Sequence, residues 1–329
     1  MELTYEQWKE ARKDVKRRLS ISGWTVLIYY LIVNVVVTGW IVVESLVRLI
    51  GGFIAGEFIS IERIATEAAE SGWGYCLAIA VGLIILLIWK KPRYFKEEMF
   101  ATGARMKPGD FFTILCIFLS TQVLSQVLCI ALELILNAFG YSIVAGMEML
   151  QTDPDNFSMF LYAGILAPIT EEILFRGLVQ RAMRPFGKKF AIFVSAFAFG
   201  LFHGNLIQTP YAFVVGLVLG FVAAEYNILW AMVLHMFNNL VLGDLLYRAL
   251  GGLPEDTVNL IVWGIILAFT VAAVILMIAR RKEIAAWLRQ EKIIGAYVGC
   301  YFSCAGTIVM LLIMGISTIV TTFEFIAPL

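Results

Sequence analysis

The chain has 329 residues, of which 60% are hydrophobic and 15% are charged, and its formal net charge at pH 7 is zero. Soluble proteins carry about 25% charged residues, so the composition excludes an ordinary soluble domain and indicates a polytopic membrane protein. A net charge of zero provides no electrostatic attraction to polyanions, and we expect no nucleic-acid partner.

A highly charged segment, residues 1–22, opens the chain, and we expect it to form a surface helix or a solvated tail. Nine apolar runs follow, most of them close to or above the roughly 20 residues that span a bilayer. They cover residues 24–43, 74–89, 111–139, 157–180, 190–206, 211–224, 228–246, 258–278 and 294–320. The predicted fold class is therefore all-α, a polytopic transmembrane helical bundle of about 8–9 spans with a polar cavity at membrane depth.

The runs form one membrane domain with three parts. N-terminal spans occupy residues 23–156, a core rich in polar side chains occupies residues 157–247, and C-terminal spans occupy residues 248–329. We interpret the central part as the catalytic core, because its apolar runs hold most of the ionisable side chains that a bilayer disfavours.

Lysine and arginine clusters follow the runs that end near residues 89, 180 and 278, and a further cluster precedes the first run. Basic loops stay in the cytoplasm, so we expect an integral multi-pass membrane protein whose N-terminus is cytoplasmic. An odd number of nine crossings would place the C-terminus on the opposite side.

The run 157–180 contains Glu171 and Glu172, two adjacent carboxylates that each cost roughly 2.5–3.5 kcal/mol on insertion scales. Glu172 and Arg176 are four residues apart, so they share one helical face in the favourable order and can neutralise each other. Glu171 is turned about 100° away and has no partner within one turn. We therefore predict that Glu171 is the carboxylate left for chemistry and that Glu172 and Arg176 support the site structurally.

The only two histidines, His203 and His235, both lie in apolar runs. A single histidine there is often a packing residue, but two beside an unpaired glutamate favour function. Asn239 follows His235 by four residues and therefore points the same way from one helix. Three helices can aim Glu171, His203, His235 and Asn239 at one point.

This set is sufficient for peptide hydrolysis, because a carboxylate can deprotonate water and a histidine can hold that water. A histidine and an asparagine amide can also stabilise an oxyanion. Glu171, His203 and His235 would equally suit a catalytic zinc ion. The sequence lacks the stronger His-Glu-x-x-His signature, and we expect no cofactor, with zinc as the alternative.

Glu171-Glu172-x-x-x-Arg176, Phe199-x-x-x-His203 and His235-x-x-x-Asn239 resemble, in order, the motifs of the CPBP family of intramembrane proteases. This family contains type II CAAX prenyl endopeptidases and bacteriocin-processing, Abi-like proteins. The resemblance covers about residues 157–243 and implies a hydrophilic cavity open to the cytoplasmic side. It further implies that Glu171 activates water with help from His203, and that His235 and Asn239 form the oxyanion hole.

Two questions stay open at this stage. A non-catalytic transporter or immunity protein could also place such residues at the membrane midplane. An enzyme could act on a prenylated protein or on a leader-bearing peptide, in contact with membrane lipids, and in an unknown oligomeric state. Gln122 and Gln126, four apart in one run, could line a channel or a substrate groove, or only join helices through hydrogen bonds.

Overall fold

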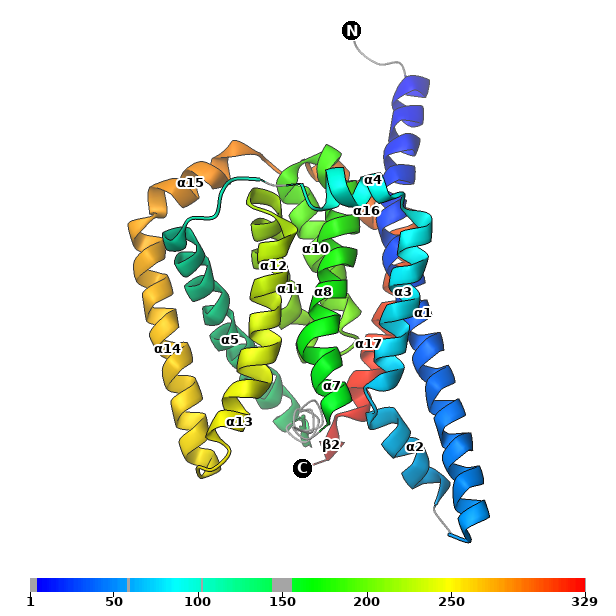
Figure 1. Cartoon of the computed structure of the whole chain (residues 1–329). Coiled ribbons are helices and arrows are strands. Elements are labelled where there is room, and N and C mark those ends of the chain that lie inside the picture. The colour runs from blue at the N-terminus through cyan, green and yellow to red at the C-terminus, as the bar shows by residue number, and fades with distance from the viewer. Residues whose placement is uncertain (1–4, 58–59, 102, 144–155, 329) are drawn as a thin grey trace.

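The computed structural model describes residues 5–57, 60–101, 103–143 and 156–328, so the first four residues of the predicted N-terminal segment lie outside the described part. Within these ranges the chain is a bundle of helices that run between two common ends, with the N-terminus at one end and the C-terminus at the other (Figure 1).

The first elements are α1 (Tyr5–Ala55), α2 (Ile61–Glu70), α3 (Trp73–Trp89), α4 (Pro92–Tyr94), the π-helix η1 (Phe95–Met99), α5 (Pro108–Asn137) and β1 (Tyr141–Ser142). The central ones are α7 (Phe157–Leu161), η2 (Tyr162–Leu166), α8 (Ala167–Glu172), η3 (Ile173–Gln180), α9 (Arg181–Met183), η4 (Arg184–Phe186), α10 (Lys188–Phe202), α11 (Gln208–Glu225), α12 (Ile228–Met236), η5 (Phe237–Leu245) and α13 (Leu246–Leu250). The last ones are α14 (Glu255–Ala279), α15 (Arg281–Gln290), α16 (Gly295–Phe302), α17 (Ala305–Glu324) and β2 (Ala327–Pro328).

Seven helices in the described ranges are long and apolar enough to cross a membrane, and α2 with α3 forms an eighth candidate, bent by 51° at its break. The predicted all-α polytopic bundle is thereby confirmed, and the protein is an integral multi-pass membrane protein. Each of the nine apolar runs contains a helix, but α10 has only 15 residues. The last run is divided, since α16 ends before α17 begins.

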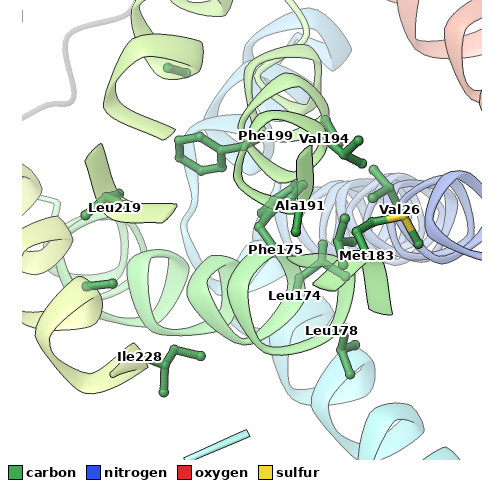
Figure 2. Packing of buried hydrophobic residues seen from close by; sticks show 14 of the residues in the cluster. Val26, Leu174, Phe175, Leu178, Met183, Ala191, Val194, Phe199, Leu219 and Ile228 are labelled. Carbon is green, nitrogen blue, oxygen red and sulfur yellow. The ribbon is translucent and has the colours of Figure 1, made fainter. Parts of the chain in front are cut away.

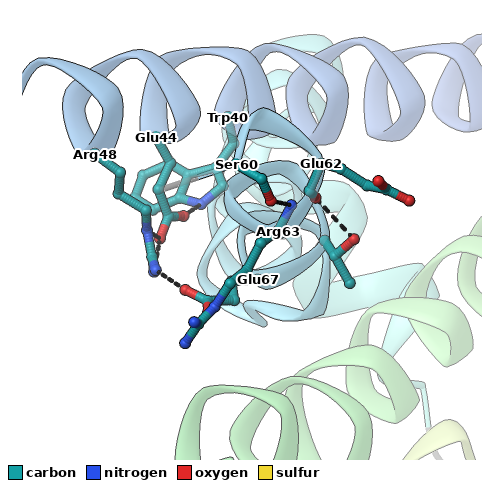
Figure 3. A network of polar contacts seen from close by, with 8 residues as sticks. Trp40, Glu44, Arg48, Ser60, Glu62, Arg63 and Glu67 are labelled. Atoms are coloured by element: carbon teal, nitrogen blue, oxygen red, sulfur yellow. Dashed lines mark hydrogen bonds and ion pairs between the residues drawn. The ribbon is translucent and has the colours of Figure 1, made fainter. Parts of the chain in front are cut away.

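Helix α1 is a single helix of 51 residues, so the charged N-terminal segment continues into the first span without a break. At the far end of α1, Arg48 contacts Glu44 at 2.6 Å on its own helix and Glu67 of α2 at 2.8 Å. Arg63 contacts the same Glu67 at 2.8 Å, which completes the network in Figure 3. These ion pairs hold α2 against α1.

The apolar core lies where α1, η3, α10 and α11 meet. Leu174 and Phe175 of η3 pack close to Ala191 and Val194 of α10 and to Val26 of α1 (Figure 2), and all are buried. Lipid is as apolar as these side chains, so close packing and not burial from water stabilises such helix contacts. The core therefore fixes the central span rigidly against its neighbours.

The central span carries π-helical turns on both sides of Pro168. Residues 157–186 form one continuous helix, and Pro168 follows directly on the π-helix η2. The π turn accommodates the missing N–H of the proline, and such turns are frequent at functional sites.

A π turn leaves carbonyl oxygens that need donors elsewhere, and Tyr94 supplies one. Its hydroxyl donates to the Gly177 carbonyl at 2.6 Å. Burial raises the pKa of Tyr94 to about 12, so the hydroxyl keeps its proton at neutral pH. Through this hydrogen bond α4, which follows α3, holds η3 in place at its end of the bundle.

A two-residue antiparallel pairing closes the opposite end of the bundle. Tyr141 pairs with Pro328 and Ser142 with Ala327. This contact places the C-terminus beside the loop after α5, whereas α4 and α15, which carry basic clusters, lie at the end where the chain begins (Figure 1).

Candidate active site

Glu171 and Glu172 are the last two residues of α8, and this helix packs against α12. The side chain of Glu172 is fully buried, whereas that of Glu171 keeps 16% of its surface exposed. The two neighbours therefore occupy different environments, as expected from the 100° between successive side chains on a helix.

Glu172 pairs with Arg176, as the sequence predicts. The Nη1 of Arg176 lies 3.0 Å from the Oε1 of Glu172, and both side chains are completely buried. The Nη2 of Arg176 donates to the Gly216 carbonyl of α11 at 3.1 Å. A Cβ on Gly216 would lie 3.0 Å from the Cα of Ala196, so a larger residue there would push α10 and α11 apart by a few tenths of an ångström.

His235 lies between the two carboxylates. Its Nδ1 donates to the Oε1 of Glu172 at 3.0 Å, and its Nε2 lies 3.7 Å from the Oε2 of Glu171. Because the Nδ1 proton is directed at Glu172, the neutral imidazole presents a lone pair on Nε2 towards Glu171. A chain of four side chains results, from Arg176 through Glu172 and His235 to Glu171.

The second histidine, His203, caps the C-terminal end of α10. Its Nδ1 donates to the Phe199 carbonyl at 2.8 Å. The ring of Phe199 makes edge contacts with both imidazoles, at centroid distances of 4.8 Å to His203 and 5.6 Å to His235. The Cζ of the Arg176 guanidinium lies over the same ring, 4.5 Å from its centroid. Phe199, which the sequence analysis noted only as the first residue of the Phe199-x-x-x-His203 motif, therefore connects three of the predicted site residues.

Asn239 lies one turn after His235, at the start of η5. Its Nδ2 donates to the Ala163 carbonyl of η2 at 2.9 Å, and its Oδ1 accepts from Asn238 at 3.0 Å. The Oδ1 of Asn238 accepts from Gln122 at 2.9 Å. The Asn239 amide is held in place by these bonds, and its second N–H proton is left for another acceptor.

The hydrogen-bonded chain through Asn238 includes residues that sequence reasoning did not place in the site. The Nε2 of Gln122 on α5 also donates to the Tyr211 hydroxyl at 2.5 Å, and that hydroxyl donates to Asn238 at 3.2 Å. The spacing of Gln122 and Gln126 in an apolar run was the available signal for α5. Nothing in the sequence distinguishes Tyr211 from the other tyrosines.

A cavity of about 790 Å³ opens beside this chain. It is lined by Gln122, Gln126, Asn238 and Asn239 on one side and by residues of α14 on the other. Its volume lies within the range of about 300–1,000 Å³ that is usual for ligand sites. The described residues thus enclose a cavity lined in part by polar side chains, and it reaches Asn239.

The alternative zinc set does not converge on one position. Among the residues that the structure describes, no three His, Cys, Asp or Glu side chains are arranged to hold a metal ion. The Nδ1 atoms of His203 and His235 bond to the Phe199 carbonyl and to Glu172. These bonds leave both Nε2 atoms free, as in histidines that bind zinc, so the hydrogen bonds do not decide between the metal-free mechanism and the zinc alternative.

Comparison with known proteins identifies one family. Residues 153–241 match a family model described as Rce1-like, type II CAAX prenyl endopeptidase Rce1-like. Of the matched stretch, residues 156–241 belong to the described part of the chain, and they include the site from Glu171 to Asn239. No curated protein and no solved structure matches the chain.

Proposed function

We propose that this membrane protein, whose residues 153–241 match the Rce1-like type II CAAX prenyl endopeptidase model, hydrolyses peptide bonds with a water molecule that Glu171 activates. The family supports an intramembrane endopeptidase in general. The observation that carries the finer proposal is the position of Glu171, whose Oε2 faces the Nε2 of His235 at 3.7 Å inside the bundle.

The proposed reaction begins with a water molecule held between Glu171 and His235. The water would donate one hydrogen to the Glu171 carboxylate and the other to the lone pair on the His235 Nε2. Glu171 takes a proton as the water oxygen adds to the carbonyl carbon of the peptide bond. When the C–N bond breaks, Glu171 returns this proton to the leaving amine, and the carboxylate is restored.

The oxyanion that forms during this addition needs hydrogen-bond donors. Asn239 is the donor that we propose, because one of its N–H groups is fixed on the Ala163 carbonyl and the other is available. His235 could donate from Nε2 only as an imidazolium, since its Nδ1 proton is given to Glu172. We therefore assign His235 to the water and keep the oxyanion role for Asn239.

Three groups would support this chemistry without touching the substrate. Glu172 holds the His235 ring through Nδ1, Arg176 neutralises Glu172, and Phe199 packs against the imidazole. His203 contacts the same Phe199 ring, and we propose that it positions the substrate or the water without contacting Glu171 directly. No metal is required in this scheme.

We further propose that the N-terminus is cytoplasmic. The basic helices α4 and α15 lie at the same end of the bundle as the N-terminus, in agreement with the positive-inside rule (Figure 1). An impermeant maleimide applied to intact cells should label Gly252→Cys, in the loop before α14, but not Glu283→Cys on α15. Labelling of Glu283→Cys alone would reverse the orientation.

The activity is tested with purified protein in lipid bilayers and a pool of quenched fluorescent peptides. Glu171→Gln should abolish cleavage, because an amide cannot accept the proton of water at neutral pH. Glu283→Gln, which removes an exposed carboxylate on α15, is the matched control and should cleave as the wild type does. Cleavage by Glu171→Gln at the wild-type rate would refute the proposed base.

A further inference from the structure

The 790 Å³ cavity lies between α5, η5, α13 and α14, which occupy one side of the bundle (Figure 1). Its lining includes Gly251 and Leu253 from the loop between α13 and α14, and Glu255, the first residue of α14. This loop is at the end opposite to α4 and α15, the helices with basic clusters (Figure 1). The cavity therefore extends to the end of the bundle that lacks those clusters, and not to the basic, cytoplasmic end that the family resemblance implies.

The two walls of the cavity differ in chemistry. One wall, which we call the amide wall, consists of Gln122, Gln126, Asn238 and Asn239. The facing wall, on α14, consists of Val258, Val262 and Ile266, with the amide of Asn259 beside them. Among the described residues, the side chains of Gln126 and Asn259 have no hydrogen-bond partner, so their amides are available to an occupant.

The cavity comes within one helical turn of the proposed catalytic pair, Glu171 and His235, although neither residue lines it. Asn239 belongs to the amide wall and follows His235 by one turn, a rise of about 6 Å along the helix. Ala163, another lining residue, accepts the hydrogen bond from Asn239 and lies two turns before Glu171 on the central span. A chain that occupies the cavity would therefore bring its next residues to the Glu171–His235 pair.

From these two walls and their connection we infer that the cavity binds an unlipidated, extended segment of a peptide substrate, which enters from the end opposite to the basic clusters. This inference rests on the proposed endopeptidase function and specifies its substrate. The main-chain N–H and C=O groups of such a segment would bond to the amide wall. Its alternate side chains, which are apolar, would contact Val258, Val262 and Ile266 on α14.

The chemistry of the amide wall favours a peptide over an isoprenoid chain as the occupant of the cavity. A hydrocarbon chain in the cavity would desolvate the amides of Gln126 and Asn259 without bonding to them, and burial of unbonded amides is unfavourable. A peptide main chain offers each of these amides a donor or an acceptor. The end of the cavity at Glu255 favours a cation as well, because this carboxylate is exposed, whereas the Asp244 carboxylate is already paired with Arg248.

The experiment uses full-length protein in lipid bilayers and two substrate pools. The first is a quenched fluorescent nonapeptide pool with leucine at alternate positions, one lysine and mixed residues elsewhere. The second pool ends in a farnesylated Cys-a-a-X sequence. The variants are Gln126→Leu and Asn259→Leu, and the control is Leu260→Ala, which changes the neighbouring, outward-facing residue of α14.

We expect cleavage of the unlipidated pool, with a KM that rises at least tenfold in Gln126→Leu and Asn259→Leu while kcat changes less than threefold. Gln126→Asn, which keeps an amide, should restore part of the lost affinity, and Leu260→Ala should behave as the wild type. Replacement of lysine by glutamine in the peptides should weaken binding, and Glu255→Gln should remove that difference.

The outcomes separate the inference from the function on which it rests. Cleavage of the farnesylated pool alone, or an unchanged KM in both leucine variants, would overturn the inference and leave the endopeptidase proposal standing. If neither pool is cleaved by the wild type above the background of Glu171→Gln, both proposals fail.

Discussion

The Nδ1 of His235 lies 3.0 Å from the Oε1 of Glu172, and the same oxygen lies 3.0 Å from the Nη1 of Arg176. One carboxylate oxygen therefore neutralises a buried guanidinium and fixes the orientation of an imidazole. Glu172 is not only the partner of Arg176 that its sequence position predicts. Through His235 it also acts on Glu171, the adjacent residue in the chain.

Glu172→Gln should both destabilise the protein and reduce activity. It removes the charge that compensates the fully buried Arg176, and breaking a buried pair in this way costs about 3–5 kcal/mol. The loss of stability is measured as the unfolding temperature of Glu172→Gln in detergent. Glu171→Gln is the control, and it should unfold close to the wild-type temperature. Equal unfolding temperatures for the two variants would show that Glu172 has no structural role.

The two histidines should differ in their contribution to the rate. His235→Ala should lower kcat strongly, by about 100-fold or more, because His235 is the imidazole beside Glu171 and positioned acid–base groups contribute at least that factor. His203→Ala should lower kcat less, since the His203 Nδ1 is bonded to the Phe199 carbonyl. Steady-state rates on one peptide decide this, and a larger loss in His203→Ala would reverse the assignment.

Gly216→Ala should disturb the site from a distance. The added Cβ would lie 3.1 Å from the Phe199 ring and 3.0 Å from the Ala196 Cα, and overpacking of this kind costs about 1–3 kcal/mol. It would also displace the carbonyl that binds Arg176. Gly39→Ala is the matched control, because its Cβ meets nothing within 4 Å. If both variants keep wild-type stability and activity, the close approach of α10 and α11 is unimportant.

Removal of metal ions should leave the activity unchanged. The described residues offer no three-ligand arrangement, and the proposed water is activated by Glu171 and His235 alone. The rate is measured before and after dialysis against a chelator, together with the zinc content of the purified protein. Stoichiometric zinc, with loss of activity on its removal and recovery on its return, would favour the metalloprotease alternative.

The sequence predicted the helical bundle well because each span needs a long apolar run, and such runs are visible without any knowledge of contacts. It also predicted the Glu172–Arg176 pair, which depends only on spacing within one helix. The continuation of α1 from residue 5 through residue 55 was less accessible. Neither charge nor hydropathy shows whether a charged segment bends at the membrane surface or continues straight.

Residue spacing in the sequence could not predict which side chains on different helices contact each other. The family resemblance implied His203 as the partner of Glu171, whereas the structure places the His235 Nε2 3.7 Å from the Glu171 Oε2. Which of two histidines faces a glutamate depends on the rotation of α10 and α12 about their axes. The packing of Gly216 and Phe199 fixes this rotation, and so does the hydrogen-bonded chain from Gln122 through Asn238, whose members come from three different spans.

The central claim, that Glu171 directs water onto a peptide bond inside the bundle, is tested most directly by isotope incorporation. Wild-type protein and Glu171→Gln in lipid bilayers are incubated with the peptide pool in ¹⁸O-labelled water, and the products are analysed by mass spectrometry. The account predicts that the wild type yields fragments whose new carboxyl group contains one labelled oxygen, and that Glu171→Gln yields none. Labelled fragments from Glu171→Gln at the wild-type rate would contradict it.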